Sequence, residues 1–325
     1  MKLLKTVFFI LMFFVLSISP VSAEVYSYGK DSTVIGDVQT YKVNGNESLI
    51  EVARSFRLGY NEIVDANPAL DPFLPGNNST VKIPTVWILP DIPSYDGIVI
   101  NISEMRLYYF LKQKKALLVR TFPIGIGDEG NDTPVGSFKI IEKIANPAWH
   151  VPESIKKERP ELPAVIPPGP DNPLGSHALR LSLGSYLIHG TNRPWAVGRR
   201  VTHGCIRLYP EDIPKLFQVV PNGMKVTIVR QPVKVGVKDN KVYIEVHKSD
   251  YEKNTNYFNE AVELLKKKGL LKKVNTEKLY HAIREKSGIP VEISGFKIEL
   301  PQKIFTENFL REREITSSAV IQMPF

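Results

Sequence analysis

Two histidines, a cysteine and an arginine could do chemistry together in this chain. The segment Leu-Ile-His-Gly ends a β-rich run at His189, and Thr-His-Gly-Cys-Ile-Arg follows from His203 through Cys205 to Arg207. A free thiol has a pKa of about 8.5 and is mostly protonated at neutral pH, so a nucleophilic cysteine needs a base or a positive field nearby. Either histidine could be that base. The set therefore favours acyl transfer by a Cys–His pair.

The residues next to Cys205 suit the same reaction. Gly204 removes a side chain just before the thiol, which lets backbone N–H groups approach a developing oxyanion. Arg207 places a fixed positive charge two residues later, where it could bind a carboxylate of the substrate. These residue types indicate a reaction class, but they do not choose the substrate.

The same stretch resembles the signature of the L,D-transpeptidase (YkuD-like) catalytic domain, which is a first histidine, a gap, and then Ser/Thr-His-Gly-Cys. Thr202 occupies the Ser/Thr position. Further matches lie across residues 97–231, at Asn101-Ile102, Arg106-Leu107-Tyr108, Pro123-Ile124-Gly125, Thr133-Pro134, Asn146-Pro147 and Asn172-Pro173-Leu174-Gly175. The resemblance implies an enzyme that cuts and rejoins the stem peptides of peptidoglycan without a metal or another cofactor.

The resemblance also implies a role for each residue of the motif. Cys205 is expected to be the nucleophile and His189 the general base, with the carbonyl of Gly190 orienting the imidazole as the third member of a triad. His203 is expected to lie beside the thiol as a supporting group.

The remaining motif residues are expected to bind the substrate. These are Thr202, Gly204 and Arg207, with the N–H groups of Gly204 and Cys205 forming an oxyanion hole and Arg207 binding a stem carboxylate. The acyl acceptor stays open: a stem amine, the lysine of an envelope lipoprotein, or water.

Three other readings of these residues remain. His189, His203 and Cys205 could be the ligands of a zinc hydrolase with an open coordination position. The chain could be a wall-binding protein without catalysis. A cysteine endopeptidase is the nearest enzymatic alternative, and it would hydrolyse without strand exchange.

The N-terminus and the composition favour export. Lys2 and Lys5 precede an apolar run over residues 7–18 and a small-residue stretch that ends before Glu24, which predicts a secretory signal peptide over 1–23. The run is shorter than the roughly 20 residues that span a bilayer. One cysteine among 325 residues cannot pair within the chain, so its retention in an oxidising compartment suggests that the thiol is used. The formal charge of +8 suits an anionic envelope, and we find no signature of nucleic-acid binding.

Residues 39–85 read as strand, helix, helix, strand. Ser48 and Glu51 have the spacing of a capping box, and Asn67-Pro68 ends a second helix. The unit resembles a LysM domain, which implies binding of the glycan strand of peptidoglycan. The proline-rich stretch after it, Trp87 to Ser94, predicts a linker.

Residues 97–231 contain short β-rich runs separated by turns, which predicts a mainly-β catalytic domain. Seven prolines between Pro152 and Pro173 predict a lid loop without regular structure. Residues 232–325 predict a hairpin around Asp239-Asn240 followed by helices. The expected fold is therefore multidomain: a small α+β LysM module (βααβ), a mainly-β L,D-transpeptidase domain and a short helical C-terminal extension.

Overall fold

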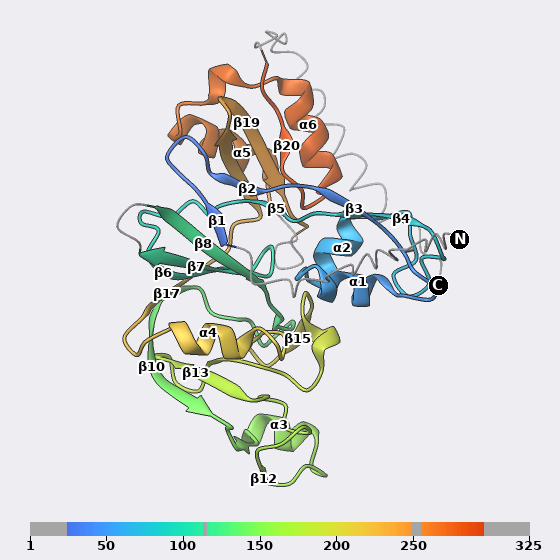
Figure 1. Cartoon of the computed structure of the whole chain (residues 1–325). Coiled ribbons are helices and arrows are strands. Elements are labelled where there is room, and N and C mark those ends of the chain that lie inside the picture. Colours follow the sequence, from blue (N-terminus) through green and yellow to red (C-terminus); the bar gives the residue numbers. More distant parts are fainter. Residues whose placement is uncertain (1–24, 113–115, 249–254, 296–325) are drawn as a thin grey trace, which may run out of the picture.

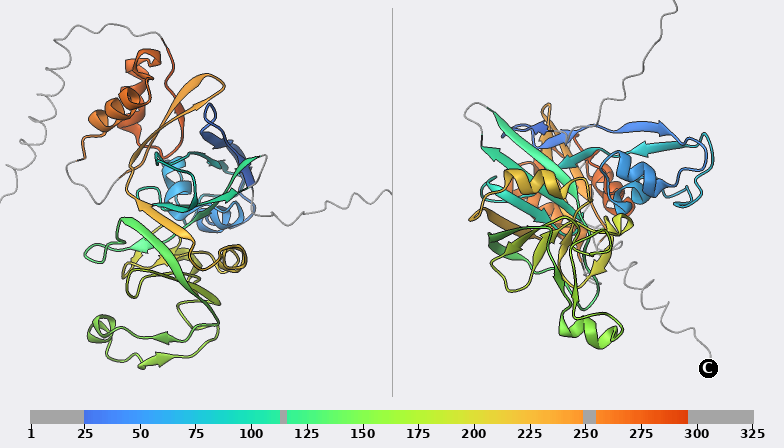
Figure 2. Two further views of the ribbon diagram at one scale, coloured as in Figure 1. Left: turned by 90° about the vertical axis from the view of Figure 1, so that its left-hand side faces the viewer. Right: turned by 60° about the horizontal axis from the view of Figure 1, so that its bottom comes forward.

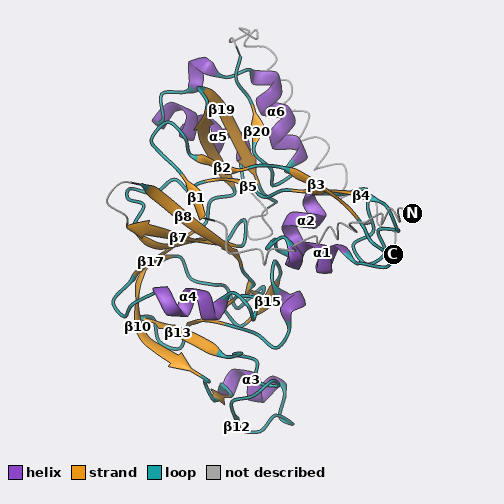
Figure 3. Ribbon diagram, viewed as in Figure 1, coloured by secondary structure: helices purple, strands orange, loops and turns teal. Residues whose placement is uncertain are grey.

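The computed structural model describes residues 25–112, 116–248 and 255–295 (Figure 1). The expected signal peptide, residues 1–23, lies outside these ranges. No helix within them is long and apolar enough to cross a membrane. Strands dominate the described chain, and the helices are short (Figure 3).

A nine-stranded sheet forms the centre of the molecule. Its neighbours run antiparallel except at β6–β17 and β14–β16, which are parallel. In spatial order the strands are β1 (Val25–Ser27), β8 (Leu117–Pro123), β7 (Arg106–Lys112), β6 (Gly97–Asn101), β17 (Lys225–Val229), β10 (Gly136–Ala145), β13 (His177–Leu181), β14 (Leu187–His189) and β16 (Ile206–Arg207).

The sheet curls so that its two halves meet near the Thr-His-Gly-Cys motif of residues 202–205. Directly after β8, Gly125 forms a bridge to Arg207 of β16. The next two residues, β9 (Ile126–Gly127), pair in parallel with β15 (Arg200–Thr202). Helix α4 (Ile213–Val219), which the sequence did not predict, packs Ile213 and Leu216 into the apolar core inside this curl.

Residues 39–83 form the expected order of elements. Strands β3 (Gln39–Lys42) and β4 (Thr80–Ile83) pair antiparallel, and helices α1 (Leu49–Ser55) and α2 (Tyr60–Ala66) lie between them in the sequence. Ser48 and Glu51 make both hydrogen bonds of the capping box that starts α1. We call residues 39–83 the βααβ unit.

The expected linker after this unit is wrong. Val86–Ile88 forms strand β5, which pairs antiparallel with β2 (Val34–Gly36), and Trp87 and Leu89 are buried. Apolar side chains of the βααβ unit and of β6, β7 and β8 belong to one continuous core. The prolines favoured a linker, but the segment between them is apolar enough to be buried. It is therefore part of the packed structure between the βααβ unit and the central sheet.

A buried ion pair crosses the same junction. The Arg106 guanidinium on β7 donates to both carboxylate oxygens of Glu62 on α2, at 2.9 and 2.6 Å, and it stacks 4.0 Å from the centre of the Trp87 ring. Thr121 accepts a further bond at 2.6 Å. Both charged side chains are almost inaccessible to solvent, so removing either one would leave the other as an unpaired buried charge and destabilise the folded protein.

The C-terminal part has its own apolar core. Its strands contact β2 and β5, and Figure 2 shows this part of the ribbon from two further directions. Asp239 and Asn240 have φ of 52° and 60°, which suits the type I′ turn expected of this hairpin. Helices follow the hairpin, in the order that the sequence predicted. The elements are β18 (Val233–Lys238), β19 (Lys241–Val246), α5 (Tyr257–Lys267), α6 (Thr276–Glu285) and β20 (Val291–Glu292).

Candidate active site

Two parallel strands bring His189 to the side of Cys205. In the register of β14 and β16, Ile188 lies opposite Ile206 and His189 opposite Arg207. Both isoleucines belong to the apolar core, so the alternation of side chains along a strand puts His189 and Arg207 on the other face. Cys205 directly precedes Ile206, and it therefore shares that face with His189.

His189 is held as a neutral base. Its ring is 3% exposed, and Nδ1 lies 2.6 Å from the carbonyl oxygen of Gly190. A carbonyl only accepts hydrogen bonds, so Nδ1 carries the proton and Nε2 keeps its lone pair. Burial and the charge of Arg207 lower the pKa of His189 to about 3, against the opposing effect of the Gly190 and Leu174 carbonyls.

Cys205 is held as a neutral thiol. Its Sγ lies 3.9 Å from the carbonyl oxygen of Ser185, and its side chain packs against the small apolar cluster of Leu174, Ala178 and Leu187. Burial raises the pKa of Cys205, and the backbone of Leu187 and the charge of Arg207 oppose that rise without reversing it. At neutral pH the resting pair is therefore thiol and imidazole, and the proton must move when the sulfur attacks.

Thr202 holds the loop that carries the thiol. Its hydroxyl donates to the carbonyl oxygen of Cys205 at 2.7 Å and accepts from the N–H of Gly204 at 3.1 Å, and the side chain is buried. The hydroxyl therefore has partners within the loop, and its expected contact with substrate stays a prediction. The Gly204 N–H, expected in an oxyanion hole, points at Thr202 in this conformation and must be released before it can bind an oxyanion.

Gly204 could not be another residue in this conformation. Its φ is +95°, and a Cβ would lie 2.6 Å from Cε1 of Tyr186. Thr133 donates its hydroxyl to the Gly204 carbonyl at 2.9 Å and so ties the loop to the turn after β9. The sequence contained Thr133 within the Thr-Pro motif, but nothing local indicated its partner.

His203 faces the lid instead of having a described contact with the thiol. Its Nε2 lies 3.2 Å from a carboxylate oxygen of Glu158 in α3 (Glu153–Glu158). The lid was expected to lack regular structure, and that expectation is wrong: besides α3 it contains β12 (Val165–Ile166), which pairs with β11 (Trp149–His150). Proline excludes long elements here, but it permits a single helical turn after Pro152 and a two-residue bridge.

A buried asparagine ties the loop of residues 152–173 to the segment just before it. Asn172 donates from Nδ2 to the carbonyls of Pro147, Ile166 and Pro167 at 2.9 to 3.1 Å, and its Oδ1 accepts from the N–H of Leu174. This asparagine is part of the Asn-Pro-Leu-Gly match to the family pattern, which did not indicate a role for it. Its role is to fix the base of the lid next to Leu174, whose carbonyl is close to His189.

Arg207 is a partly buried cation two residues after the candidate nucleophile. Within the described residues its Nε has no hydrogen-bond partner. Burial and the nearby charge of Arg193 lower the pKa of Arg207. A guanidinium with this little compensation is suited to receive a carboxylate from a substrate.

The expected motif residues do not form a metal site. Among the described residues, one group of three or more candidate ligands converges, and it consists of Glu104, Glu245 and His247, not of the motif histidines and Cys205. In that group the Nζ of Lys234 already lies 2.7 Å from Glu104 and 2.8 Å from Glu245. The ammonium therefore supplies the charge that a metal would bring.

Comparison with known proteins identifies the class. Residues 95–228 match the family model of the L,D-transpeptidase catalytic domain, YkuD. "Probable L,D-transpeptidase YcfS" of Escherichia coli K12 is 38% identical over 84% of this chain and 88% of its own length. "Probable L,D-transpeptidase YbiS" of the same organism is 42% identical over 70% of this chain and 76% of its own length. The chain belongs to the L,D-transpeptidase family and is an enzyme of that family of peptidoglycan cross-linking proteins.

Solved structures of the family are more distant. An L,D-transpeptidase from Mycobacterium smegmatis is 23% identical, with a TM-score of 0.31 over 41% of this chain and 57% of that one. The family assignment rests on the sequence matches alone.

Proposed function

We propose that this protein is an exported peptidoglycan L,D-transpeptidase with Cys205 as its nucleophile. The observation that carries the proposal is the pairing of β14 with β16, which puts His189, Cys205 and Arg207 on one face. The Gly190 carbonyl at 2.6 Å from His189 Nδ1 leaves Nε2 as the proton acceptor. Burial supplies the low-dielectric surroundings in which a positioned base and cation act most strongly.

The first half of the reaction is acylation. The thiol proton of Cys205 moves to Nε2 of His189 as Sγ attacks the carbonyl carbon of the third stem residue. A C–S bond forms, and the oxyanion is bound by the backbone N–H of Cys205 and, once released from Thr202, that of Gly204. When the C–N bond breaks, the imidazolium returns the proton to the departing amine of D-alanine, and a thioester remains. Arg207 binds a stem carboxylate.

The second half is transfer. His189 takes a proton from an incoming amine, which attacks the thioester, and then gives that proton to the departing Cys205 sulfur. The amine is the side chain of another stem, which gives a 3→3 cross-link, or the lysine of an envelope lipoprotein; water gives hydrolysis instead. No redox or metal-bound reactant is needed for the balance.

The other regions fit an envelope enzyme. We propose that residues 1–23 are a signal peptide and that the protein acts in the periplasm or cell wall. The βααβ unit, with the capped helices and paired strands of a LysM-like order, is proposed to bind the glycan strand. Binding of the glycan raises the local concentration of stems at the catalytic site.

The test is incubation with a disaccharide-tetrapeptide, followed by mass spectrometry. The expected result is loss of D-alanine together with a thioester or a dimer, present with the natural protein and absent with Cys205→Ala. His189→Gln is expected to block the same step. Equal turnover by folded Cys205→Ala would refute the nucleophile, and a tripeptide product without any dimer would identify water as the acceptor under these conditions.

A further inference from the structure

The turn between α1 and α2 of the βααβ unit lies directly against the chain that leads to the nucleophile. We call residues 57–61 the docking turn and residues 197–212 the nucleophile segment. Two backbone N–H groups at the start of α2, those of Tyr60 and Asn61, donate to the carbonyls of Val197 and Gly198 at 3.2 and 3.3 Å. The first N–H groups of a helix have no partner within it, so these two carbonyls act as its cap.

Two glycines make this approach possible. A Cβ on Gly198 would lie 2.1 Å from the nitrogen of Tyr60, and a Cβ on Gly59 would lie 2.9 Å from the Cα of Gly198. The two backbones are therefore in direct contact. One residue later, the Arg199 guanidinium lies 3.6 Å from the centre of the Tyr60 ring, and within the described residues Arg199 Nε has no hydrogen-bond partner.

The docking turn also holds the far end of the nucleophile segment. The Tyr209 hydroxyl donates to the carbonyl of Leu58 at 2.9 Å. Two ion pairs follow, from Arg57 to Asp212 at 3.2 Å and from Arg54, just before the turn, to Glu211 at 2.9 Å. The βααβ unit thus grips the segment on both sides of Cys205.

The grip reaches the reacting groups through short connections. From Arg199 the chain enters β15, whose last residue, Thr202, bonds to the carbonyl of Cys205. On the other side, the N–H of Leu208 donates to the carbonyl of His189 at 2.8 Å, one residue before Tyr209. A shift at either end would therefore change the position of the thiol relative to the imidazole.

We propose that the docking turn positions the nucleophile segment, with Tyr60 as a positioning residue that acts through Arg199. The inference rests on the proposed role of Cys205. The βααβ unit then has a second role besides any binding of glycan, because its contacts hold the nucleophile segment in position.

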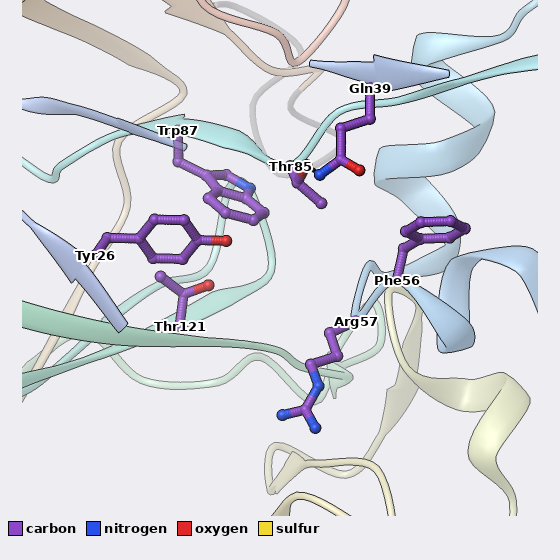
Figure 4. A pocket seen from close by; sticks show the side chains of 7 residues that line it. All are labelled: Tyr26, Gln39, Phe56, Arg57, Thr85, Trp87 and Thr121. Carbon is purple, nitrogen blue, oxygen red and sulfur yellow. Dashed lines mark hydrogen bonds between the residues drawn. The ribbon is translucent and has the colours of Figure 1, made fainter. Parts of the chain in front are cut away.

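A cavity adjoins the docking turn. A cavity of about 140 Å³ lies between the βααβ unit and the sheet, lined by Tyr26, Gln39, Phe56, Arg57, Thr85, Trp87 and Thr121 (Figure 4).

The test compares Tyr60→Ala with Tyr60→Phe, which keeps the ring over Arg199. Tyr257→Ala is the matched control, because Lys286 lies 4.1 Å from the centre of that ring, in the C-terminal part. Steady-state release of D-alanine from the disaccharide-tetrapeptide is measured to give kcat and KM, and the melting temperature of each variant is measured beside it. A 1 Å misplacement can cost roughly 100-fold in rate, so we expect a partial shift in Tyr60→Ala to lower kcat roughly tenfold with KM unchanged. Tyr60→Phe and Tyr257→Ala should keep the natural kcat.

A second pair guards against misfolding of Tyr60→Ala. Gly198→Ala clashes with the docking turn, whereas Gly130→Ala has the same kind of positive φ, +86°, with no atom within 4 Å of the added Cβ. Slower acylation in folded Gly198→Ala, with natural acylation in Gly130→Ala, supports the proposal. Natural kcat in folded Tyr60→Ala or folded Gly198→Ala overturns it. Undiminished turnover in Cys205→Ala would instead refute the proposed function, so the two failures are distinguishable.

Discussion

Replacing Glu62 by glutamine should destabilise the protein more than its small change in shape suggests. The carboxylate accepts two bonds from Arg106, and the two side chains are 6% and 1% exposed. Glutamine fills the same space but has no charge, so Arg106 stays buried without its counter-ion. Breaking a buried pair from one side costs about 3 to 5 kcal/mol. At about 2 to 4 °C per kcal/mol for a chain of this size, the melting temperature should fall by roughly 6 to 20 °C.

Differential scanning calorimetry of the natural protein and of matched variants checks this number. Glu161→Gln makes the same chemical change in a pair with Arg159 that is more than half exposed, and should leave the melting temperature almost unchanged because solvent screens an exposed pair. Glu62→Leu combined with Arg106→Met should recover part of the loss, because it removes both charges but leaves the Gly59 N–H and Trp87 Nε1 without their acceptor. If Glu62→Gln melts with the exposed control, the pair does not stabilise the junction and the reasoning is wrong.

Three further predictions concern the site. Burial raises the pKa of Cys205 and lowers that of His189 to about 3, so the thiolate fraction should keep rising with pH. The rate of alkylation of Cys205 by iodoacetamide should therefore still increase at pH 9. A plateau of that rate between pH 5 and 8 would instead indicate a thiolate–imidazolium pair. His189→Gln should lower acyl transfer by about 10²- to 10⁴-fold and His203→Gln by less, since the His203 ring faces Glu158; the reverse order in a D-alanine release assay would exchange their roles. Asn172→Ala should leave three carbonyls without a donor and speed proteolysis within residues 152–173, and cleavage as slow as in the natural protein would argue against a tethering role.

Local features of the fold were readable from the sequence because their causes are local. The Ser48 and Glu51 capping box, the I′ turn at Asp239 and Asn240, and the start of α6 after Asn275 each depend on side chains within a few residues. The strands of the central sheet were found for the same reason, from short apolar runs between turn residues.

Segments that depend on distant partners were missed or misread. Strand β1 exists because Val25 lies opposite Arg120 on β8. Strand β5 exists because it pairs with β2 and because Trp87 packs into the core that the βααβ unit shares with the sheet. A pattern within either segment does not reveal such partners, and prolines beside Trp87 favoured a linker instead.

For the candidate site, the sequence by itself determined the residue types, their spacing and the family. The tertiary structure decided which groups meet: His189 reaches the face of Cys205 through the pairing of β14 with β16, Gly190 fixes the tautomer, and His203 turns to the lid. It also decided that both members of the pair are neutral, because burial is a property of the whole fold. A motif specifies the available chemistry, whereas protonation and geometry depend on neighbours that are far away in the chain.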